Sequence, residues 1–485
     1  MEKLENFQTR IKKEKDPIFR TDLLLAEKLA KAIKKARGRA LVVGGFVRDE
    51  ILTKWGKGSP SKDLDLEVYG LSDKKLKKIL SHFGKVNLVG ESFSVFKLGA
   101  LDISLPRKDS KISKGHQGFK VIYDPKLSFK EAAKRRDFTI NALGLDPLTG
   151  EILDEHQGLS DLKKGILRAV DFQLFGDDPL RVLRAAQLTS RLNFKIEEKT
   201  LKICQKLDLL ELSWERIGEE FKKLLLLSEK PSIGLDYVRK LGVIKKLFPE
   251  LMALIGLKQY KKWHPEGDVW IHNNMVIDEA AKISRQKKLS GEKSEQIMWS
   301  ALVHDFGKAV TTKNEGGDKF TSIGHTDEGV PIAKKFLKRL KLSNKLIAEI
   351  LPLVKEHLFP ILVAKSCGDA AIRRLAKRLQ PATINDLLLL CEADHRGRKV
   401  KWDGFPEGKI LAQKAQILHL KEKAPQPIFW GRHLLELGFK PQKQEKLFGQ
   451  VIKMVNEEEL DGKIKNLIEA KTRAVKVAKE MGLKK

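Results

Sequence analysis

The chain has 485 residues, of which 41% are hydrophobic and 33% charged, so it is too long for one core and two to four domains are expected. Its 94 Lys and Arg outnumber its 64 Asp and Glu, and the net charge of +30 favours a nucleic-acid partner over a merely lysine-rich composition. The cysteines are far apart and form no CxxC pair, which excludes a disulfide scaffold and a thiolate zinc site. No apolar run reaches the length of a membrane span and no signal-peptide core is present, which excludes a membrane protein. We therefore expect a cytoplasmic chain with no membrane partner and no disulfide-linked partner.

The predicted elements change character along the chain. Residues 1–37 predict a charged helical extension, and residues 38–150 combine short β-rich runs such as ALVVGG with turns. After about residue 155 these runs give way to apolar residues at helical spacing, as in WERIGEEFKKLLLL. We therefore expect a multidomain α+β protein with an α/β head followed by an all-helical remainder.

A run of alternating apolar and acidic residues, DLDLEVYG, places two carboxylates close together. Asp63 and Asp65 lie two residues apart, so on a strand they share a face and would raise each other's pKa. A divalent cation removes that conflict, and hard oxygen ligands suit Mg²⁺. Glu67 continues the face as either a further ligand or a solvated neighbour. Because such pairs are common by chance, the prediction depends on the preceding residues.

Those preceding residues, LVVGGFVRD, predict a strand, a glycine pair and the start of a helix. Gly44 and Gly45 before a helix N-terminus expose N–H groups to phosphate, and Arg48 adds a cation one turn later. A phosphate cradle beside a magnesium platform indicates nucleotidyl transfer, whereas the alternative is an ordinary glycine turn. The chain contains neither GxxxxGK[ST] nor GxGxxG, which argues against a P-loop enzyme and a dinucleotide-binding fold.

Two further runs, KRRDFTINAL and DDPLRVLRAA, follow in order. Together the four runs resemble the head of class II tRNA nucleotidyltransferases, the CCA-adding enzymes, and of bacterial poly(A) polymerases, within the polymerase β-like superfamily. The resemblance implies two Mg²⁺ ions, one lowering the pKa of the tRNA 3′-hydroxyl and one neutralising the leaving pyrophosphate. It assigns the ions to Asp63 and Asp65, with Asp102 as a third catalytic carboxylate, and the triphosphate to Gly44, Gly45 and Arg48.

The same resemblance implies how CTP and ATP are selected. Cytosine and adenine each present an amino group beside a ring-nitrogen acceptor, so a carboxylate and a guanidinium can bind both and reject uracil and guanine. The implied residues are Asp177, Asp178 and Arg181, although Asp178 could simply cap a helix from Pro179. Asp177 replaces the family's Glu, and Gln187 stands where relatives have Arg.

The remaining implied contacts lie on either side of these residues. Arg136 and Arg184 match positions that contact the nucleotide, while Asp137 and Asn141 would hold their motif together. Residues 106–120 match a loop that helps switch from C to A addition, with Arg107 and Asp109 as its basic and acidic pair; the alternative is a solvated hairpin loop.

A second set of ligand-type residues lies in a helical context between residues 262 and 398. A lone histidine is usually a core residue, but four histidines and two aspartates in this order predict a mixed nitrogen and oxygen site for Mn²⁺, Ni²⁺ or Co²⁺. The order resembles the HD domain fused to CCA-adding enzymes of some bacteria, which implies phosphohydrolysis of 2′,3′-cyclic and other nucleotide phosphates, with Asp305 orienting a hydroxide. The predicted ligands are His272, His304, Asp305, His325, His357 and Asp394.

The combined prediction is template-independent CCA addition to tRNA with a second phosphohydrolase activity. The alternatives are a poly(A) polymerase, which generally lacks an HD block, a partial CC- or A-adding enzyme, and an inactive RNA-binding protein. The predicted domains are an N-terminal extension (1–37), a polymerase β-like nucleotidyltransferase head (38–165), a helical neck and body for RNA and nucleotide (166–260), an HD domain (261–400) and a basic helical tail (401–485).

Overall fold

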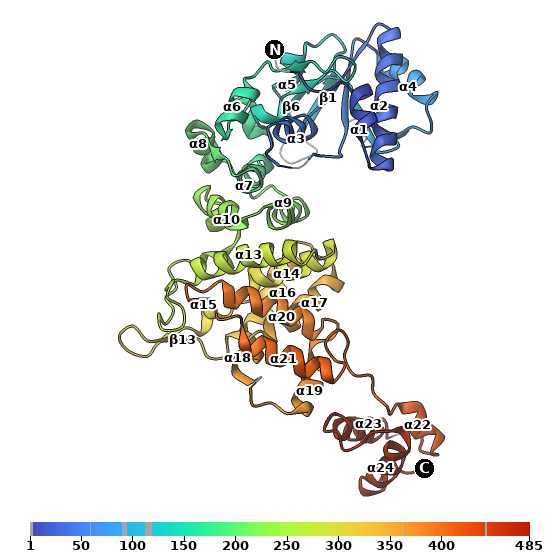
Figure 1. The fold of residues 1–485 in the computed structure, drawn as a ribbon, viewed down its shortest axis with the longest axis vertical. Helices are drawn as coiled ribbons and strands as arrows, with labels where there is room; N and C mark the ends of the chain where they lie inside the picture. The colour runs from blue at the N-terminus through green and yellow to red at the C-terminus, as the bar shows by residue number, and fades with distance from the viewer. Residues whose placement is uncertain (1–2, 59, 90–94, 112–118, 364, 442–443) are drawn as a thin grey trace. The chain divides into compact units, whose positions relative to one another are not determined.

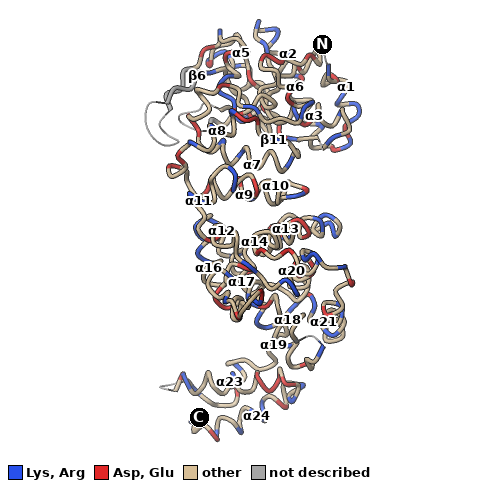
Figure 2. Tube along the Cα trace, turned by 90° about the vertical axis from the view of Figure 1, so that its left-hand side faces the viewer, with Lys and Arg blue, Asp and Glu red and all other residues tan. Residues whose placement is uncertain are grey.

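The computed structural model describes residues 3–58, 60–89, 95–111, 119–363, 365–441 and 444–485. The chain forms two compact units (Figure 1). The head unit comprises Met1–Ser228 and Ile233–Phe248, and the helical unit comprises Glu229–Ser232 and Pro249–Lys485. Lys and Arg recur along both units (Figure 2). Within the described ranges, no helix combines the length and apolar character that a membrane span requires.

A seven-stranded sheet forms the centre of the head unit, in the order β3-β4-β5-β2-β1-β8-β9. Its pairs are antiparallel except β2 and β5, which run parallel and place Asp65 beside Asp102. The buried apolar residues of β1 and β2 put the core against this sheet. The strands are β1 (Arg39–Val43), β2 (Asp65–Tyr69), β3 (Asn87–Val89), β4 (Val95–Leu98), β5 (Leu101–Ser104), β8 (Gly144–Leu145) and β9 (Ile152–Leu153).

The N-terminal segment belongs to this core. Asp16 caps α2 by accepting from the N–H groups of Ile18 and Phe19, and α2 packs against β1. Phe7 of α1 and Leu23 of α2 are buried, and α1 packs against α2. The helices of this part are α1 (Phe7–Lys13), α2 (Pro17–Lys35), α3 (Gly45–Lys54), α4 (Asp73–Ser81), α5 (Phe129–Ala133) and α6 (Gly158–Lys164).

The rest of the head unit is mainly helical, and α7 packs against α9. Two small sheets accompany it: the antiparallel pair β6 (Arg107–Lys111) and β7 (Phe119–Tyr123), and the parallel pair β10 (Ile166–Leu167) and β11 (Lys195–Ile196). The helices are η1 (Thr139–Asn141), η2 (Leu174–Asp177), α7 (Leu180–Leu192), α8 (Glu198–Lys206), α9 (Trp214–Leu227), α10 (Pro231–Lys240, which crosses between the units) and α11 (Val243–Leu247).

The helical unit is built around α13, α14 and α20, which pack on one another (Figure 1). This unit is largely rather than entirely helical, since it contains a two-stranded hairpin of β12 (Lys313–Asn314) and β13 (Phe320–Thr321). Gly316 and Gly317, both with positive φ, allow the turn between the two strands. The last three helices share a separate core that includes Phe429, Val451 and Val477. The helices are α12 (Pro249–Met252), α13 (Val269–Gln286), α14 (Gly291–Val303), α15 (Lys308–Thr311), α16 (His325–Arg339), α17 (Asn344–Glu356), α18 (Phe359–Val363), α19 (Asp369–Leu379), α20 (Ile384–Arg396), α21 (Pro406–Ile417), α22 (Gly431–Glu436), α23 (Glu445–Leu460) and α24 (Leu467–Glu480).

Candidate active sites

Three predicted carboxylates lie at one end of the head sheet. Strand β2 begins at Asp65, so the expectation that one strand carries both Asp63 and Asp65 is wrong. The register explains this: Asp65 pairs with Val43, the last residue of β1, which leaves no strand residue opposite Asp63. Both aspartates are exposed and flank a buried Leu64, and the parallel register places Asp102 beside Asp65.

The charges around Asp65 affect its pKa. Partial desolvation, followed by the negative charge of Asp102, raises the pKa of Asp65 to about 6, although the nearby Arg136 guanidinium opposes the shift. A carboxylate whose pKa is raised by burial and by a neighbouring carboxylate binds a cation favourably, because the cation offsets both effects. The all-oxygen donor set fits a hard divalent ion such as Mg²⁺.

The predicted glycine pair lies directly against these carboxylates. Gly44 has φ +81° and caps α3, a backbone conformation that favours glycine. A Cβ at this position would lie 3.5 Å from Oδ2 of Asp65 and 3.8 Å from a terminal nitrogen of Arg136. The turn therefore brings the N-terminus of α3, with its free N–H groups, to the carboxylates and a cation.

Two of the predicted nucleotide-binding arginines are joined by a buried hydrogen-bond chain. Arg48 is 3% exposed and donates to Asp49 at 2.7 Å and to the Asn141 side chain at 2.6 Å. Asn141 donates to Asp137 at 2.9 Å, and Asp137 accepts from Arg184 at 2.8 Å. Asp137 and Asn141 thus connect the two arginines and fix their positions.

Glu67 differs from both alternatives that the sequence suggested. Its side chain is fully buried and accepts hydrogen bonds from Arg135 at 2.6 Å, Arg136 at 3.1 Å and the Tyr69 hydroxyl at 2.7 Å. Burial alone would raise the pKa of Glu67, but Arg136 and Arg135 lower it to about 2. Glu67 is therefore neither a solvated residue nor a ligand at the sheet end; it holds Arg136 in place.

The predicted base-selecting residues lie around the start of α7. Asp178 accepts from the N–H of Leu180 at 3.2 Å, and Arg216 donates to both of its oxygens at 3.2 and 2.9 Å. Arg181 donates to the carbonyl oxygens of Leu174 at 2.7 Å and Arg135 at 2.6 Å.

Asp177 ends η2, directly before Asp178. The sequence alone did not predict a role for Arg216, because its contact with Asp178 depends on the packing of α7 against α9. Arg107 begins β6, whereas residues 112–118 and the side chain of Asp109 lie outside the described part of the predicted switching loop.

The six ligand-type residues of the helical unit converge as a buried cluster. The Nε2 atom of His272 lies 3.0 Å from Oδ1 of Asp394, and those of His325 and His357 lie 3.3 Å apart. Asp305 lies 3.3 Å from Nε2 of His304 and 3.4 Å from Nε2 of His325. Their donor atoms form two adjoining groups: His272, His304 and Asp394, and Asp305, His325 and His357.

Hydrogen bonds to the backbone orient three of these imidazoles. In each, Nδ1 lies within hydrogen-bond distance of the carbonyl oxygen three residues earlier, so Nδ1–H donates and Nε2 is left as an acceptor facing the cluster. The pairs are His304 with Ala301 at 2.9 Å, His325 with Ser322 at 2.7 Å and His357 with Val354 at 2.7 Å.

The cluster fits divalent metal. Nε2 of His304 and Oδ1 of Asp305 are buried without a hydrogen-bond partner among the described residues, an arrangement that is costly unless a cation satisfies them. Burial lowers the pKa of His357 to about 3, so this imidazole stays neutral. Neutral nitrogen and anionic oxygen donors suit first-row transition metals.

Two further charged residues, which the sequence analysis missed, support the cluster. Nζ of Lys308 lies 2.7 Å from Asp305 and donates to Gln259 at 2.7 Å. Glu266 lies between His264 and His272, 3.0 and 2.9 Å from their Nδ1 atoms. The sequence signal for Lys308 is its place in the run HDFGK, next to two predicted ligands, and that for Glu266 is its place in the run WHPEGD.

A pocket of about 800 Å³ opens onto the cluster within the helical unit. Asp305, His325 and His357 line its inner part, and Trp263 and Lys319 line it farther out. Trp263 is 60% exposed, which leaves an aromatic surface for a flat ligand. The volume lies within the range of small-ligand sites.

Comparison with known proteins places three domains on the chain. The family model for the poly A polymerase head domain matches residues 40–168, and the HD domain matches residues 269–397. A probable RNA and SrmB-binding site of polymerase A matches residues 193–255.

Individual proteins match most of the chain. The multifunctional CCA protein of Stenotrophomonas maltophilia is 34% identical over 77% of this chain and 90% of its own length. Two solved structures share the fold. A Bacillus stearothermophilus CCA-adding enzyme in complex with CTP has a TM-score of 0.63 and 18% identity, and the match covers 96% of this chain and 99% of that one. A Thermotoga maritima CCA-adding enzyme complexed with tRNA has a TM-score of 0.57 and 19% identity, and the match covers 98% of this chain and 99% of that one. At these identities the solved structures establish the fold alone.

Proposed function

Because the chain belongs to the multifunctional CCA proteins, the class II CCA-adding enzymes that carry an HD domain, we propose that it adds CCA to tRNA 3′ ends from CTP and ATP and hydrolyses phosphate esters at its HD domain. A cytoplasmic location accords with this role. A poly(A) polymerase is disfavoured by the HD cluster.

In the head, Asp63, Asp65 and Asp102 would hold Mg²⁺, which when bound supplies the charge that activates the 3′-hydroxyl and balances pyrophosphate. Gly44 and Gly45 admit a triphosphate to the N–H groups of α3, and Arg136, fixed by Glu67, adds a cation beside it. The observation that carries this proposal is the meeting of Asp65, Asp102 and the Gly44 turn at one sheet end.

Base selection is assigned to Asp178 and Arg181. Arg181 uses two of its five N–H groups on carbonyl oxygens, so others remain for a ring nitrogen. Arg216 fixes Asp178, whose oxygens retain lone pairs for an exocyclic amino group. Asp177, one residue earlier, completes the acidic pair, and Arg184 is held for nucleotide contact by Asp137.

The test uses tRNA transcripts that end before CCA, after C and after CC, each with Mg²⁺ and one labelled nucleotide. CCA addition predicts C on the first two transcripts and A on the third. Long A tails would favour a poly(A) polymerase, and no incorporation with any transcript would favour RNA binding alone. Asp65→Ala should abolish incorporation.

For the HD domain we propose Mn²⁺, Ni²⁺ or Co²⁺ as the metal and a nucleotide phosphate, including 2′,3′-cyclic phosphates, as the substrate. His272, His304, Asp305, His325, His357 and Asp394 would hold the metal, which when bound supplies an activated water. Trp263 offers a base-stacking surface and Lys319 a cation in the pocket above. Release of phosphate from cyclic nucleotides tests the proposal, and Trp263→Ala should raise KM more than it lowers kcat.

A further inference from the structure

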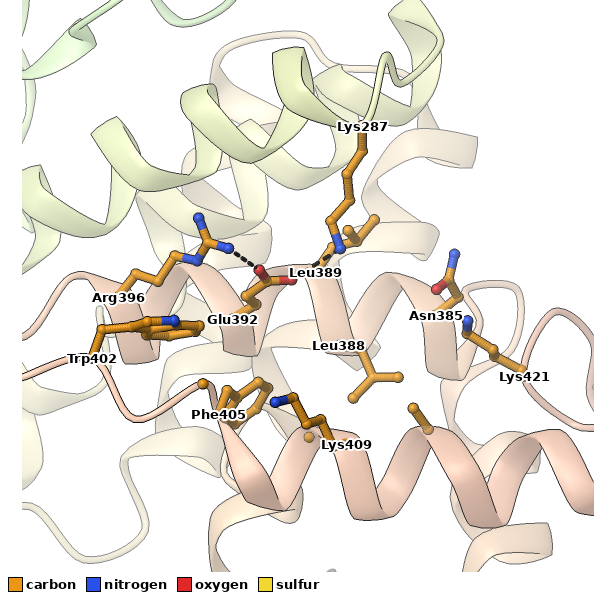
Figure 3. Close-up of a pocket in the computed structure, with 13 residues that line it drawn as sticks. Lys287, Asn385, Leu388, Leu389, Glu392, Arg396, Trp402, Phe405, Lys409 and Lys421 are labelled. Carbon is orange, nitrogen blue, oxygen red and sulfur yellow. Dashed lines mark hydrogen bonds and ion pairs between the residues drawn. The ribbon is translucent and has the colours of Figure 1, made fainter.

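Figure 3 shows a second pocket in the helical unit, of about 400 Å³, whose lining includes none of the six cluster residues. Both involve α20 but use different faces of it. Asp394 points into the cluster, whereas Glu392 and Arg396, each two residues away, line the pocket. Residues two apart on a helix lie on nearly opposite sides. The two pockets have no lining residue in common.

The charges in this pocket are unbalanced. Its lining includes Lys287, Arg396, Lys409 and Lys421 against one carboxylate, Glu392. Glu392 lies 3.0 Å from Lys287 and 2.5 Å from Arg396, so these two cations are already paired (Figure 3). Among the described residues, neither Lys409 nor Lys421 has a carboxylate oxygen within 4.0 Å of its Nζ, which leaves both available to an anion.

An aromatic surface accompanies these lysines. The Arg396 guanidinium lies 4.8 Å from the centre of the Trp402 ring, and Trp402 is 46% exposed. Figure 3 shows Trp402, Phe405 and Lys409 along one side of the pocket. Gly404 has φ +85°, a backbone conformation that favours glycine, and it lies beside Lys409, whose Nζ would be 3.0 Å from a Cβ there. An indole surface beside free ammonium groups is the combination that binds a base and its phosphate.

A second hollow of about 330 Å³ adjoins the first and shares Arg396 and Trp402 with it. Trp402 therefore stands between two neighbouring spaces. A free nucleotide needs one such space, whereas two adjoining spaces beside an aromatic residue give room for successive nucleotides of a strand.

We propose that this pocket binds a nucleoside phosphate as part of an RNA strand, with a base against Trp402 and phosphate at Lys409 and Lys421. The site lies outside both catalytic centres, and its function is to bind RNA. Because such contacts are electrostatic and stacking contacts, they are independent of base sequence.

The test measures binding by the full-length protein in EDTA, without turnover, so its result is independent of both activities. The probes are a tRNA transcript lacking CCA and, separately, AMP as a free nucleoside phosphate. Lys409→Glu/Lys421→Glu should weaken binding about 10-fold or more, and should reduce the dependence of log Kd on log salt by about 2. The matched control, Lys335→Glu/Lys423→Glu, makes the same charge change at exposed lysines outside the pocket.

A second variant tests the aromatic surface. Trp402→Leu should weaken binding, and Trp402→Phe should restore most of it, because a phenyl ring still stacks. Lys409→Ala serves if the double variant fails to fold. Loss of tRNA affinity alone supports the strand, and loss of AMP affinity as well supports the shared nucleoside-phosphate chemistry with a free ligand as its source. Pocket variants that bind both probes as tightly as the control would overturn the proposal.

Discussion

At the scale of single residues, the head site depends on buried polar groups that hold arginines in place. Glu67 fixes Arg136, and Asp137 with Asn141 fixes Arg48 and Arg184. These residues lie beside the carboxylates proposed to hold Mg²⁺ or beside the residues predicted to contact the nucleotide. Their removal should therefore affect geometry and stability together.

Replacing Glu67 by Gln should destabilise the head unit by about 3 kcal/mol, because it leaves Arg135 and Arg136 without their buried anion. It should also raise the KM for CTP and ATP, since Arg136 loses its orientation. Urea unfolding followed by hydrogen exchange in β1 and β2 checks the first effect. Glu155→Gln, an exposed carboxylate, is the control; equal stability of both variants would contradict the prediction.

Asp137 should make the head unit sensitive to acid. Burial would raise the pKa of Asp137, but the Arg184 guanidinium and the Asn141 amide lower it below its ordinary value. A carboxylate with a lowered folded-state pKa stabilises the protein above its unfolded pKa of about 4, and this stability is lost as the pH falls further.

Asp137→Asn should therefore flatten the fall of the urea midpoint below about pH 4. Arg184→Met should flatten it too, because it removes the charge that lowers the pKa. Identical slopes in the parent and both variants would show that another group causes the acid sensitivity.

At the scale of elements, the site is set by where one strand ends and its neighbour begins. Strand β1 ends at Val43, the chain turns at Gly44, and Asp65 starts the paired part of β2 opposite Val43. The turn and the carboxylates are therefore neighbours because of register.

Gly44→Ala tests this turn. Its φ of +81° and ψ of −144° make any side chain there strained by about 1–3 kcal/mol, and the added methyl would lie against Asp65. Nucleotide incorporation should fall at least 10-fold with a modest loss of stability. Gly256→Ala is a matched control, because Gly256 has φ +79° and open space around it; an equal loss of incorporation in this variant would assign the effect to strain alone.

Sequence patterns could predict those parts of the fold and sites that are encoded locally. Helical spacing predicted the helical remainder, and the HD cluster was predicted because its order along the chain is distinctive; its six residues do converge. The start of β2 could not be predicted, because alternation continues to Asp63 while its strand partner ends. The contact of Arg216 with Asp178 and the burial of Glu67 depend on distant segments. Their sequence neighbourhoods contain no signal for either.

At the scale of the whole molecule, the two candidate centres lie in separate compact units, the carboxylates in one and the HD cluster in the other. A substitution in one centre should therefore abolish the activity of that centre and leave the other activity intact. Asp65→Ala should abolish nucleotide addition and preserve phosphohydrolysis, and His304→Ala should do the reverse. Both rates are measured on one preparation of each variant, and loss of both activities in either variant, with the fold intact, would contradict the separation.

Metal should stabilise the helical unit through the same cluster. The buried Oδ1 of Asp305 and Nε2 of His304 lack hydrogen-bond partners within the described ranges, so a bound ion removes an unfavourable term from the folded state alone. At a free metal concentration of about 100 times Kd the gain is about 2.7 kcal/mol, which raises the Tm of this unit by about 5 °C or more. Calorimetry of EDTA-treated protein before and after addition of Mn²⁺, Ni²⁺ or Co²⁺ measures the shift. Asp65→Ala should retain this increase in Tm and Asp305→Asn should lose it, because only the second substitution removes a donor from the cluster. Each variant is compared with its own metal-free form. An undiminished shift in Asp305→Asn would place the stabilising metal elsewhere.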